Sequence, residues 1–188
     1  MINFAVFETA IGRCGIVWSD GGIAGVQLPE RSEAATRKRM LRRFPTAREC
    51  APPADVRRAI DDIVALLGGE HRDFNHVTID IGAVPEFHCR VYEVARRIPA
   101  GATLSYGDVA ERLGDRNLAR DVAEALSQNP CPIIVPCHRV MAAGGKPGGF
   151  SAPGGVATKL RLLTIEGARP EAPTLFDRLP LAVARRRR

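Results

Sequence analysis

The sequence lacks any segment that could cross a membrane as a helix. No apolar run in its 188 residues approaches the roughly 20 residues that a spanning helix needs. The N-terminus, MINFAVFETA, has no basic stretch before an apolar core, so it does not resemble a secretory signal. With an ordinary hydrophobic content of 45%, these absences favour a globular, cytoplasmic protein without membrane attachment.

Paired cysteine motifs are also missing. Five cysteines are scattered along the chain without a C-x-x-C pair. An odd number in a chain of this kind argues against a disulfide framework. The neighbouring histidines do not have the spacing of a zinc finger, so we expect no metal site. The five thiols belong to Cys14, Cys50, Cys89, Cys131 and Cys137.

The chain has a shortage of acidic residues, which leaves a net charge of +6. Residues 31–58 carry nine Lys and Arg against three acids, and residues 169–188 carry six against two. Residues 83–168 are nearly balanced, with ten basic and eight acidic side chains. Such a charge suits a polyanionic partner, but a solvated Arg-rich helix and an unstructured tail fit equally well. Charge alone therefore leaves nucleic-acid binding open.

The first 82 residues have the pattern of a small α/β domain. β-friendly apolar runs separated by glycine turns predict strands, and basic or amphipathic stretches between them predict helices. Strands followed by helices indicate one layered unit. The predicted strands are 2–7, 14–18, 23–28 and 77–81, and the predicted helices are 32–44 and 53–67.

Residues 83–168 are predicted to form a second, mainly helical domain. Ser105 and Asp108 have the spacing of a capping box at the start of a short helix. This helix and the next, joined by a turn at Gly114, resemble a helix-turn-helix, which is a generic signal. The Pro-rich, Arg-ending tail 169–188 is expected to be disordered. The predicted helices are 86–97, 106–113, 117–127 and 156–166, with a short buried strand at 133–135.

The stretch IIVPCHRV places a thiol, an imidazole and a guanidinium at Cys137, His138 and Arg139. Pro136 ends strand pairing, so strict alternation fails there and the thiol and imidazole can cooperate. A cysteine reacts as thiolate and needs a base or a positive charge nearby. Cysteine is also among the most buried residue types and often only fills a core. The residues alone leave both interpretations of Cys137 open.

The wider run NPCPIIVPCHRV, residues 129–140, resembles the active-site signature of the O6-alkylguanine-DNA alkyltransferases, or methylated-DNA–protein-cysteine methyltransferases. FHCRVYEVARRIPAGATLSYGDVA at 87–110 and TKLRLLTIEG at 158–167 are similar to other parts of that family. The resemblance implies an α+β fold in which an N-terminal α/β domain precedes a winged-helix-like domain carrying the helix-turn-helix. It further implies a monomer without a cofactor, whose partner is double-stranded DNA containing alkylated guanine.

The resemblance also implies a chemistry. An alkyl group would pass irreversibly from guanine O6, and also from thymine O4, to Cys137, once per protein molecule. His138 would deprotonate the thiol through a water, and Glu166 would orient the imidazole. Asn129 would brace the turn that carries the cysteine. Tyr106 would donate its phenol to the flipped-out base.

Further residues are assigned to DNA and to the base by the same resemblance. Arg120 would fill the space that the flipped base leaves in the stack, and small residues on its helix would let the DNA approach closely. Carbonyls of Cys137 and Val140 would recognise the guanine amino group. The small residues are Ala119 and Ala123, and the substrate pocket would be lined by Pro132, Val140, Phe150 and Ser151.

The chain departs from the family pattern at two places. The helix of Arg120 usually reads R-A-V-G-x-A, whereas here Asp121 and Glu124 add two anions. Phe150 stands where tyrosine is more usual. An alternative is therefore a paralogue that senses alkylated DNA with weak or altered transfer activity. A Cys-His hydrolase is disfavoured, because no oxyanion site is signalled.

Overall fold

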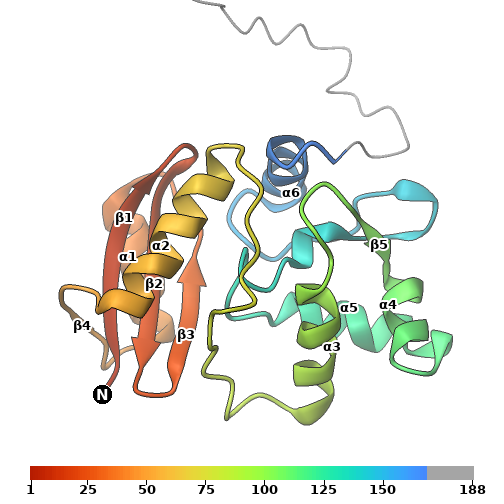
Figure 1. The fold of residues 1–188 in the computed structure, drawn as a ribbon, viewed down its shortest axis with the longest axis horizontal. Coiled ribbons are helices and arrows are strands. Elements are labelled where there is room, and N and C mark those ends of the chain that lie inside the picture. The colour runs from red at the N-terminus through yellow and green to blue at the C-terminus, as the bar shows by residue number, and fades with distance from the viewer. Residues whose placement is uncertain (169–188) are drawn as a thin grey trace, which may run out of the picture.

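Four strands near the N-terminus form one sheet, in the order β3-β2-β1-β4 (Figure 1). β1 (Asn3–Thr9), β2 (Gly12–Ser19) and β3 (Gly22–Gln27) are antiparallel neighbours. The short β4 (Arg48–Glu49) pairs parallel to β1 and was not predicted. This computed structural model describes residues 1–168, so the tail that was expected to be disordered lies outside the described residues.

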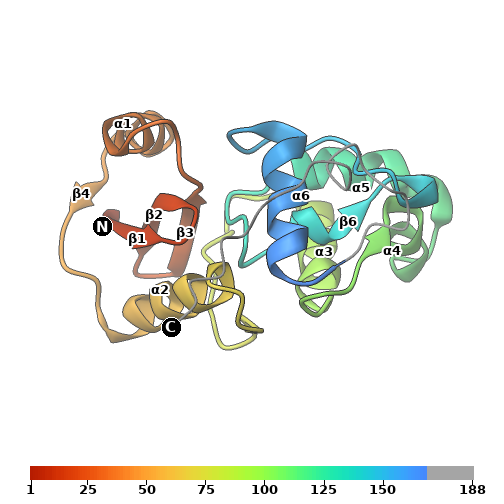
Figure 2. The same cartoon turned by 90° about the horizontal axis from the view of Figure 1, so that it is seen from above.

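Two helices cover opposite faces of the sheet, as Figure 2 shows from above. α1 (Glu33–Arg43) places Met40 in a small cluster with Val17 of β2. α2 (Ala54–Leu67) packs against the other face, where Ile16 points. Adjacent β2 residues thus serve different faces, as the twofold side-chain period of a strand requires. Both helices agree with the sequence prediction.

The second half contains a helix-turn-helix on a supporting helix. α3 (Glu86–Arg96) packs against α5 (Ala119–Ser127), which in turn packs against α4 (Tyr106–Arg112). The Ser105 hydroxyl and the Asp108 carboxylate form the expected capping box at the start of α4. Residues 117 and 118, predicted as the start of the helix that is α5, belong instead to a separate 3-10 turn, Arg116–Leu118.

Two further elements complete this half. β5 (Leu104–Ser105) and β6 (Val140–Met141) form a two-stranded parallel sheet. α6 (Gly155–Ile165) is the last described helix, and Figure 2 shows it between the first sheet and the helix-turn-helix. A 3-10 turn, Cys137–Arg139, precedes β6 directly and contacts α6.

The predicted strand at 133–135 is wrong. The segment is a tight turn in which Ile133 has a φ of 77° and the Val135 N–H donates to the Cys131 carbonyl at 2.8 Å. Prolines at 130, 132 and 136 remove three N–H donors from this segment, so it cannot sustain a ladder. Its apolar side chains are buried because the turn lies inside the protein.

The predicted strand at 77–81 is also wrong. Only Ile79 forms an isolated bridge, with Ile23 of β3. The Ile23 N–H donates to the Thr78 carbonyl at 2.9 Å, and the Ile23 carbonyl accepts from the Asp80 N–H at 2.8 Å. Further along the same strand edge, the Val26 N–H donates to the Pro130 carbonyl at 2.9 Å. Segments from beyond the sheet therefore cover the outer edge of β3.

The two halves share one hydrophobic core. A single cluster of buried side chains contains Trp18 and Ile63 from the first half, and Val91 and Leu162 from the second. The division near residue 82 thus separates two kinds of architecture without separating two cores. Whether each half is a domain that folds alone stays a prediction.

Candidate active site

Asn129 fixes the turn that leads to Cys137. Its Nδ2 donates to the Val135 carbonyl at 2.8 Å, and its Oδ1 accepts from the Cys131 N–H at 2.9 Å. The same Nδ2 also donates to the Cys137 Sγ at 3.2 Å. One half-buried side chain therefore closes the turn and provides a hydrogen bond that favours the thiolate over the thiol.

The 3-10 turn sends three successive side chains in different directions. A 3-10 helix has three residues per turn, so Cys137, His138 and Arg139 point about 120° apart. The thiol lines a pocket, whereas the other two side chains are buried in the protein. The turn thus permits the cooperation that a regular strand would forbid.

Glu166 joins His138 and Arg139 in a buried network at the end of α6. Its Oε1 lies 2.8 Å from His138 Nε2 and accepts from Arg139 Nη2 at 2.8 Å, while its Oε2 accepts from Arg139 Nε at 2.9 Å. Burial alone would raise the pKa of Glu166, but the hydrogen bonds and charges of both partners outweigh burial and lower this pKa to about 2. Glu166 is therefore an anion at neutral pH.

The ionised carboxylate determines which imidazole nitrogen carries the proton. A carboxylate only accepts hydrogen bonds, so Nε2 of His138 must be the protonated nitrogen. Nδ1 then holds the lone pair, and this buried atom has no hydrogen-bond partner within residues 1–168. Burial lowers the pKa of His138, although Glu166 opposes that effect. The neutral ring is thus ready to accept a proton at Nδ1.

Lys159 is a buried cation that the sequence analysis missed. Its side chain is fully buried, its Nζ donates to the Val140 carbonyl at 2.6 Å, and the same Nζ lies 5.7 Å from the centre of the Tyr106 ring. Burial lowers the pKa of Lys159 to about 8. A signal was present, because Lys159 shares a helix face with the buried Leu162 and Leu163 at i+3 and i+4.

Opposing influences act on the thiol itself. Burial raises the pKa of Cys137, while the hydrogen bond from Asn129 and the charge of Lys159 lower it. The net direction is upward, so the resting cysteine is a thiol that needs a base to react. His138 is the base nearest in sequence and belongs to the same turn.

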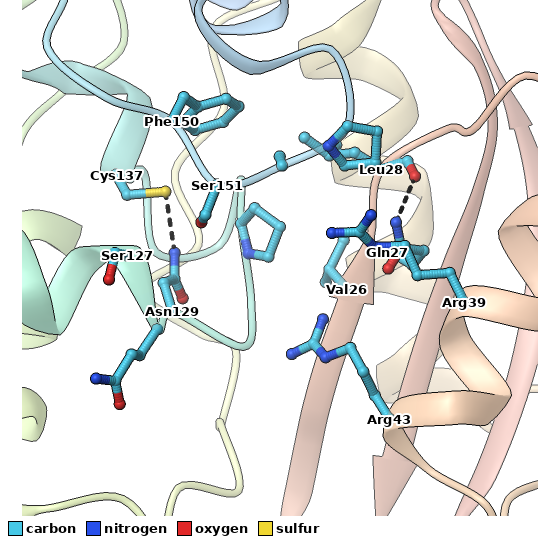
Figure 3. Close-up of a pocket in the computed structure, with 14 residues that line it drawn as sticks. Val26, Gln27, Leu28, Arg39, Arg43, Ser127, Asn129, Cys137, Phe150 and Ser151 are labelled. Carbon is cyan, nitrogen blue, oxygen red and sulfur yellow. Dashed lines mark hydrogen bonds between the residues drawn. The ribbon is translucent and has the colours of Figure 1, made fainter.

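Cys137 opens into a pocket of about 230 Å³ between the two halves (Figure 3). Three residues expected there, Pro132, Phe150 and Ser151, do line it together with Asn129. The fourth, Val140, is buried outside the lining. The sequence analysis missed the wall that comes from the end of β3, the residue after it and α1, namely Val26, Gln27, Leu28, Arg39 and Arg43.

Tyr106 lies beside the pocket without lining it. It is the first residue of α4, and its ring packs against Gly148, where an added Cβ would come within 3.1 Å of the ring. Burial, and secondarily the Cys137 charge, raise the pKa of the Tyr106 phenol. The phenol is therefore a hydrogen-bond donor at neutral pH.

Apart from Tyr106 on α4, the residues expected to meet DNA lie in the first half of α5. Arg120 is exposed in the first turn, and Ala119 and Ala123 are half-buried. Asp121 and Glu124 are exposed on the same helix. The structure does not bring Arg120 into the lining of the Cys137 pocket.

Within residues 1–168, metal and membrane features are absent. No group of three or more His, Cys, Asp or Glu side chains in this range could hold a metal ion. None of the helices in this part of the chain is long and apolar enough to cross a membrane. All five cysteines are free.

The sequence and the fold are both similar to those of known proteins. The profile described as "6-O-methylguanine DNA methyltransferase, DNA binding domain" matches residues 86–168. A methylated-DNA–protein-cysteine methyltransferase of Methanothermobacter thermautotrophicus is 36% identical over 84% of this chain and 81% of its own length. One from Mycobacterium tuberculosis is 37% identical over 84% and 96%. The crystal structure of Mycobacterium tuberculosis OGT in complex with DNA aligns with a TM-score of 0.69 at 30% identity, covering 88% of this chain and 92% of that one.

Proposed function

Because the chain belongs to the methylated-DNA–protein-cysteine methyltransferase family, we propose that it repairs DNA by transferring an alkyl group from guanine O6 to Cys137. The observation that carries this proposal is a thiol that lines a pocket and precedes a buried His138–Glu166 pair in one turn. The product is a stable thioether, so each molecule reacts once.

Proton transfer is proposed to follow the order of the hydrogen bonds. Glu166 keeps the Nε2 proton of His138 in place, and Nδ1 takes the Cys137 proton through a water. The sulfur–carbon bond forms as the bond between carbon and O6 breaks. The departing guanine gains a proton from the Tyr106 phenol. The Tyr106 phenolate then regains a proton from solvent, and His138 releases the proton of Cys137 to solvent.

Access to O6 requires the nucleotide to leave the duplex, because the reacting carbon is out of reach inside the stack. Arg120, exposed at the start of α5, would fill the gap. Ala119 and Ala123 would let that helix approach the DNA. The Val140 carbonyl already accepts from Lys159, so recognition of the guanine amino group would use its second lone pair.

The pocket is proposed to hold the base and its alkyl group. Pro132, Phe150 and Ser151 line it beside Cys137, which supports this role. Thymine alkylated at O4 would be a second substrate, because it presents an equivalent alkyl carbon on a smaller base. The size range of alkyl groups would be set by the segment after Phe150.

The proposal is tested by incubating the protein with duplex DNA containing O6-methylguanine and measuring its intact mass. We expect one methyl group per protein, located on Cys137 by peptide mapping. Cys137→Ser should abolish the adduct and keep DNA binding, whereas the matched control Cys50→Ser, at an exposed thiol, should react normally.

The same experiment addresses the alternative of a damage sensor. The exposed Asp121 and Glu124 beside Arg120 favour weak or altered DNA contacts. They do not touch the Cys137 pocket. Tight binding of alkylated DNA without an adduct would identify a sensor, and the absence of both binding and adduct would refute both functions.

A further inference from the structure

The C-terminal half of α1 is strongly basic. Lys38, Arg39, Arg42 and Arg43 lie within its last six residues, and its one acidic residue, Glu33, lies at the other end. Arg39 pairs with Glu30 at 3.0 Å and keeps 36% of its side chain exposed. Arg43 forms no ion pair with any residue in the range 1–168. Cations near a helix C-terminus are favourable, but this effect does not explain where these two arginines point.

Arg39 and Arg43 both line the pocket that contains Cys137. Figure 3 shows them on α1, across the pocket from Cys137 and Asn129. The Arg43 Nη2 lies 3.5 Å from the Pro130 carbonyl, in the segment that leads to the reactive turn. Ser127, the last residue of α5, lines the same pocket. The basic end of α1 therefore faces the end of the helix expected to meet DNA.

On the other side of this pocket, basic residues are nearly balanced by acidic ones. On α5, the single cation Arg120 is accompanied by Asp121 and Glu124, and residues 83–168 have ten basic against eight acidic residues. Residues 31–58 carry nine basic against three acidic residues. Tight binding of duplex DNA at physiological salt depends on neutralising several phosphates. Beside the pocket, the net positive charge is therefore on α1 and not on α5.

We propose that Arg39 and Arg43 bind phosphates of the DNA strand whose nucleotide enters the pocket, so that the DNA-binding surface extends from α5 onto α1. The inference rests on the proposed function for the identity of the polyanion. A flipped-out nucleotide brings its flanking phosphates to the pocket mouth. Arginine suits such phosphates because its planar group can donate two parallel hydrogen bonds. Arg39 would exchange its contact with Glu30 for a phosphate or share both.

The test compares two double variants with the same loss of charge. Arg39→Ala with Arg43→Ala removes the proposed contacts. Arg57→Ala with Arg58→Ala removes two exposed cations from α2, on the opposite face of the sheet. Each pair is made in a Cys137→Ser background, and binding of duplex DNA containing O6-methylguanine is measured between 50 and 200 mM salt. The same pairs with Cys137 intact are then tested for reaction with that duplex and with free O6-benzylguanine.

A plot of log affinity against log salt has a negative slope, and the loss of two phosphate contacts should make that slope shallower by about 1.8. The parental protein would then lose about 12-fold more affinity than the α1 variant across this fourfold salt range. The α2 pair should keep the parental slope, and Arg39→Lys with Arg43→Lys should recover most of it. Reaction with the free base should be unchanged in the α2 pair, and in the α1 pair it should fall much less than reaction with duplex DNA.

Equal slopes for the α1 and α2 pairs would overturn the proposal. So would an α1 pair whose rate falls, relative to the parental protein, as much with the free base as with DNA, because the arginines would then only shape the pocket wall. Failure of the proposed function is separate: the parental chain would form no adduct with either substrate, while its DNA-binding slope would still report on α1. A parental chain that binds no DNA would refute both.

Discussion

Replacing Glu166 with Gln should destabilise the protein and also remove part of its pH dependence. The ordinary pKa of a glutamate is 4.5, and hydrogen bonds from His138 and Arg139 lower that of Glu166 to about 2. At about 1.4 kcal/mol for each tenfold change in acidity, the folded state gains about 3 kcal/mol from this anion at neutral pH. Removing one partner of a buried ion pair typically costs a similar amount, about 3–5 kcal/mol.

The sign of the pH effect follows from the lowered pKa of Glu166. The stabilisation is complete above about pH 4.5, where the unfolded carboxyl is ionised, and it decreases as pH falls toward 2. The stability difference between the parental protein and Glu166→Gln should therefore be greatest at neutral pH and shrink in acid. Urea unfolding at several pH values, followed by far-UV circular dichroism, measures this difference.

The matched control is Glu93→Gln, an exposed carboxyl on α3. It should change the free energy of unfolding by less than about 0.5 kcal/mol at any pH. If Glu166→Gln were as stable as this control at pH 7, or if its deficit did not shrink in acid, the assignment of a buried anion at Glu166 would be wrong.

Three other substitutions test neighbouring parts of the site. Asn129→Ala should cost about 2–3 kcal/mol, because the Val135 carbonyl and the Cys131 N–H lose their partner; it should also move the rate–pH profile with free O6-benzylguanine to higher pH, and an unmoved profile would exclude a role for Asn129 in thiolate stabilisation. Lys159→Met removes a cation whose pKa is about 8 when folded and 10.5 ordinarily, so the unfolded chain holds this proton more tightly. Between pH 8 and 10.5, the free energy of unfolding of the parental protein should therefore rise by about 3 kcal/mol relative to that of Lys159→Met. A difference in urea unfolding that stays constant with pH would contradict the burial of a charged Lys159. Asp121→Ala with Glu124→Ala should tighten binding to duplex DNA several-fold at low salt and less at high salt, as fluorescence anisotropy would measure; unchanged affinity would mean that both carboxylates face away from DNA.

Features with a local sequence signal were predictable. The capping box of Ser105 and Asp108, and the helices before Gly68 and Gly167, follow from residue types only a few positions apart. The apolar run at 133–135 had an equally clear signal but misled, because composition does not distinguish a buried turn from a buried strand. The positive φ of Ile133 depends on the surrounding hydrogen bonds, chiefly those of Asn129.

The partners of Cys137 were not predictable from local chemistry. Asn129 lies 8 residues from Cys137, and Glu166 lies 28 residues from His138, so only the family resemblance suggested them. The helix face of Lys159 signalled its burial, but its donation to the Val140 carbonyl was not predictable because it depends on how α6 packs. The pocket wall with Arg39 and Arg43 escaped because it forms only when the two halves pack against each other.

The covered edge of β3 also bears on solubility. An exposed edge strand offers unpaired N–H and C=O groups to other chains and invites aggregation. Here the outward-facing backbone groups of Ile23 and Val26 form hydrogen bonds with the backbone of Thr78, Asp80 and Pro130. The segment that positions the reactive turn thus also shields the sheet from intermolecular pairing. A substitution that displaces this segment would therefore disturb the reactive turn and also expose an aggregation-prone edge strand.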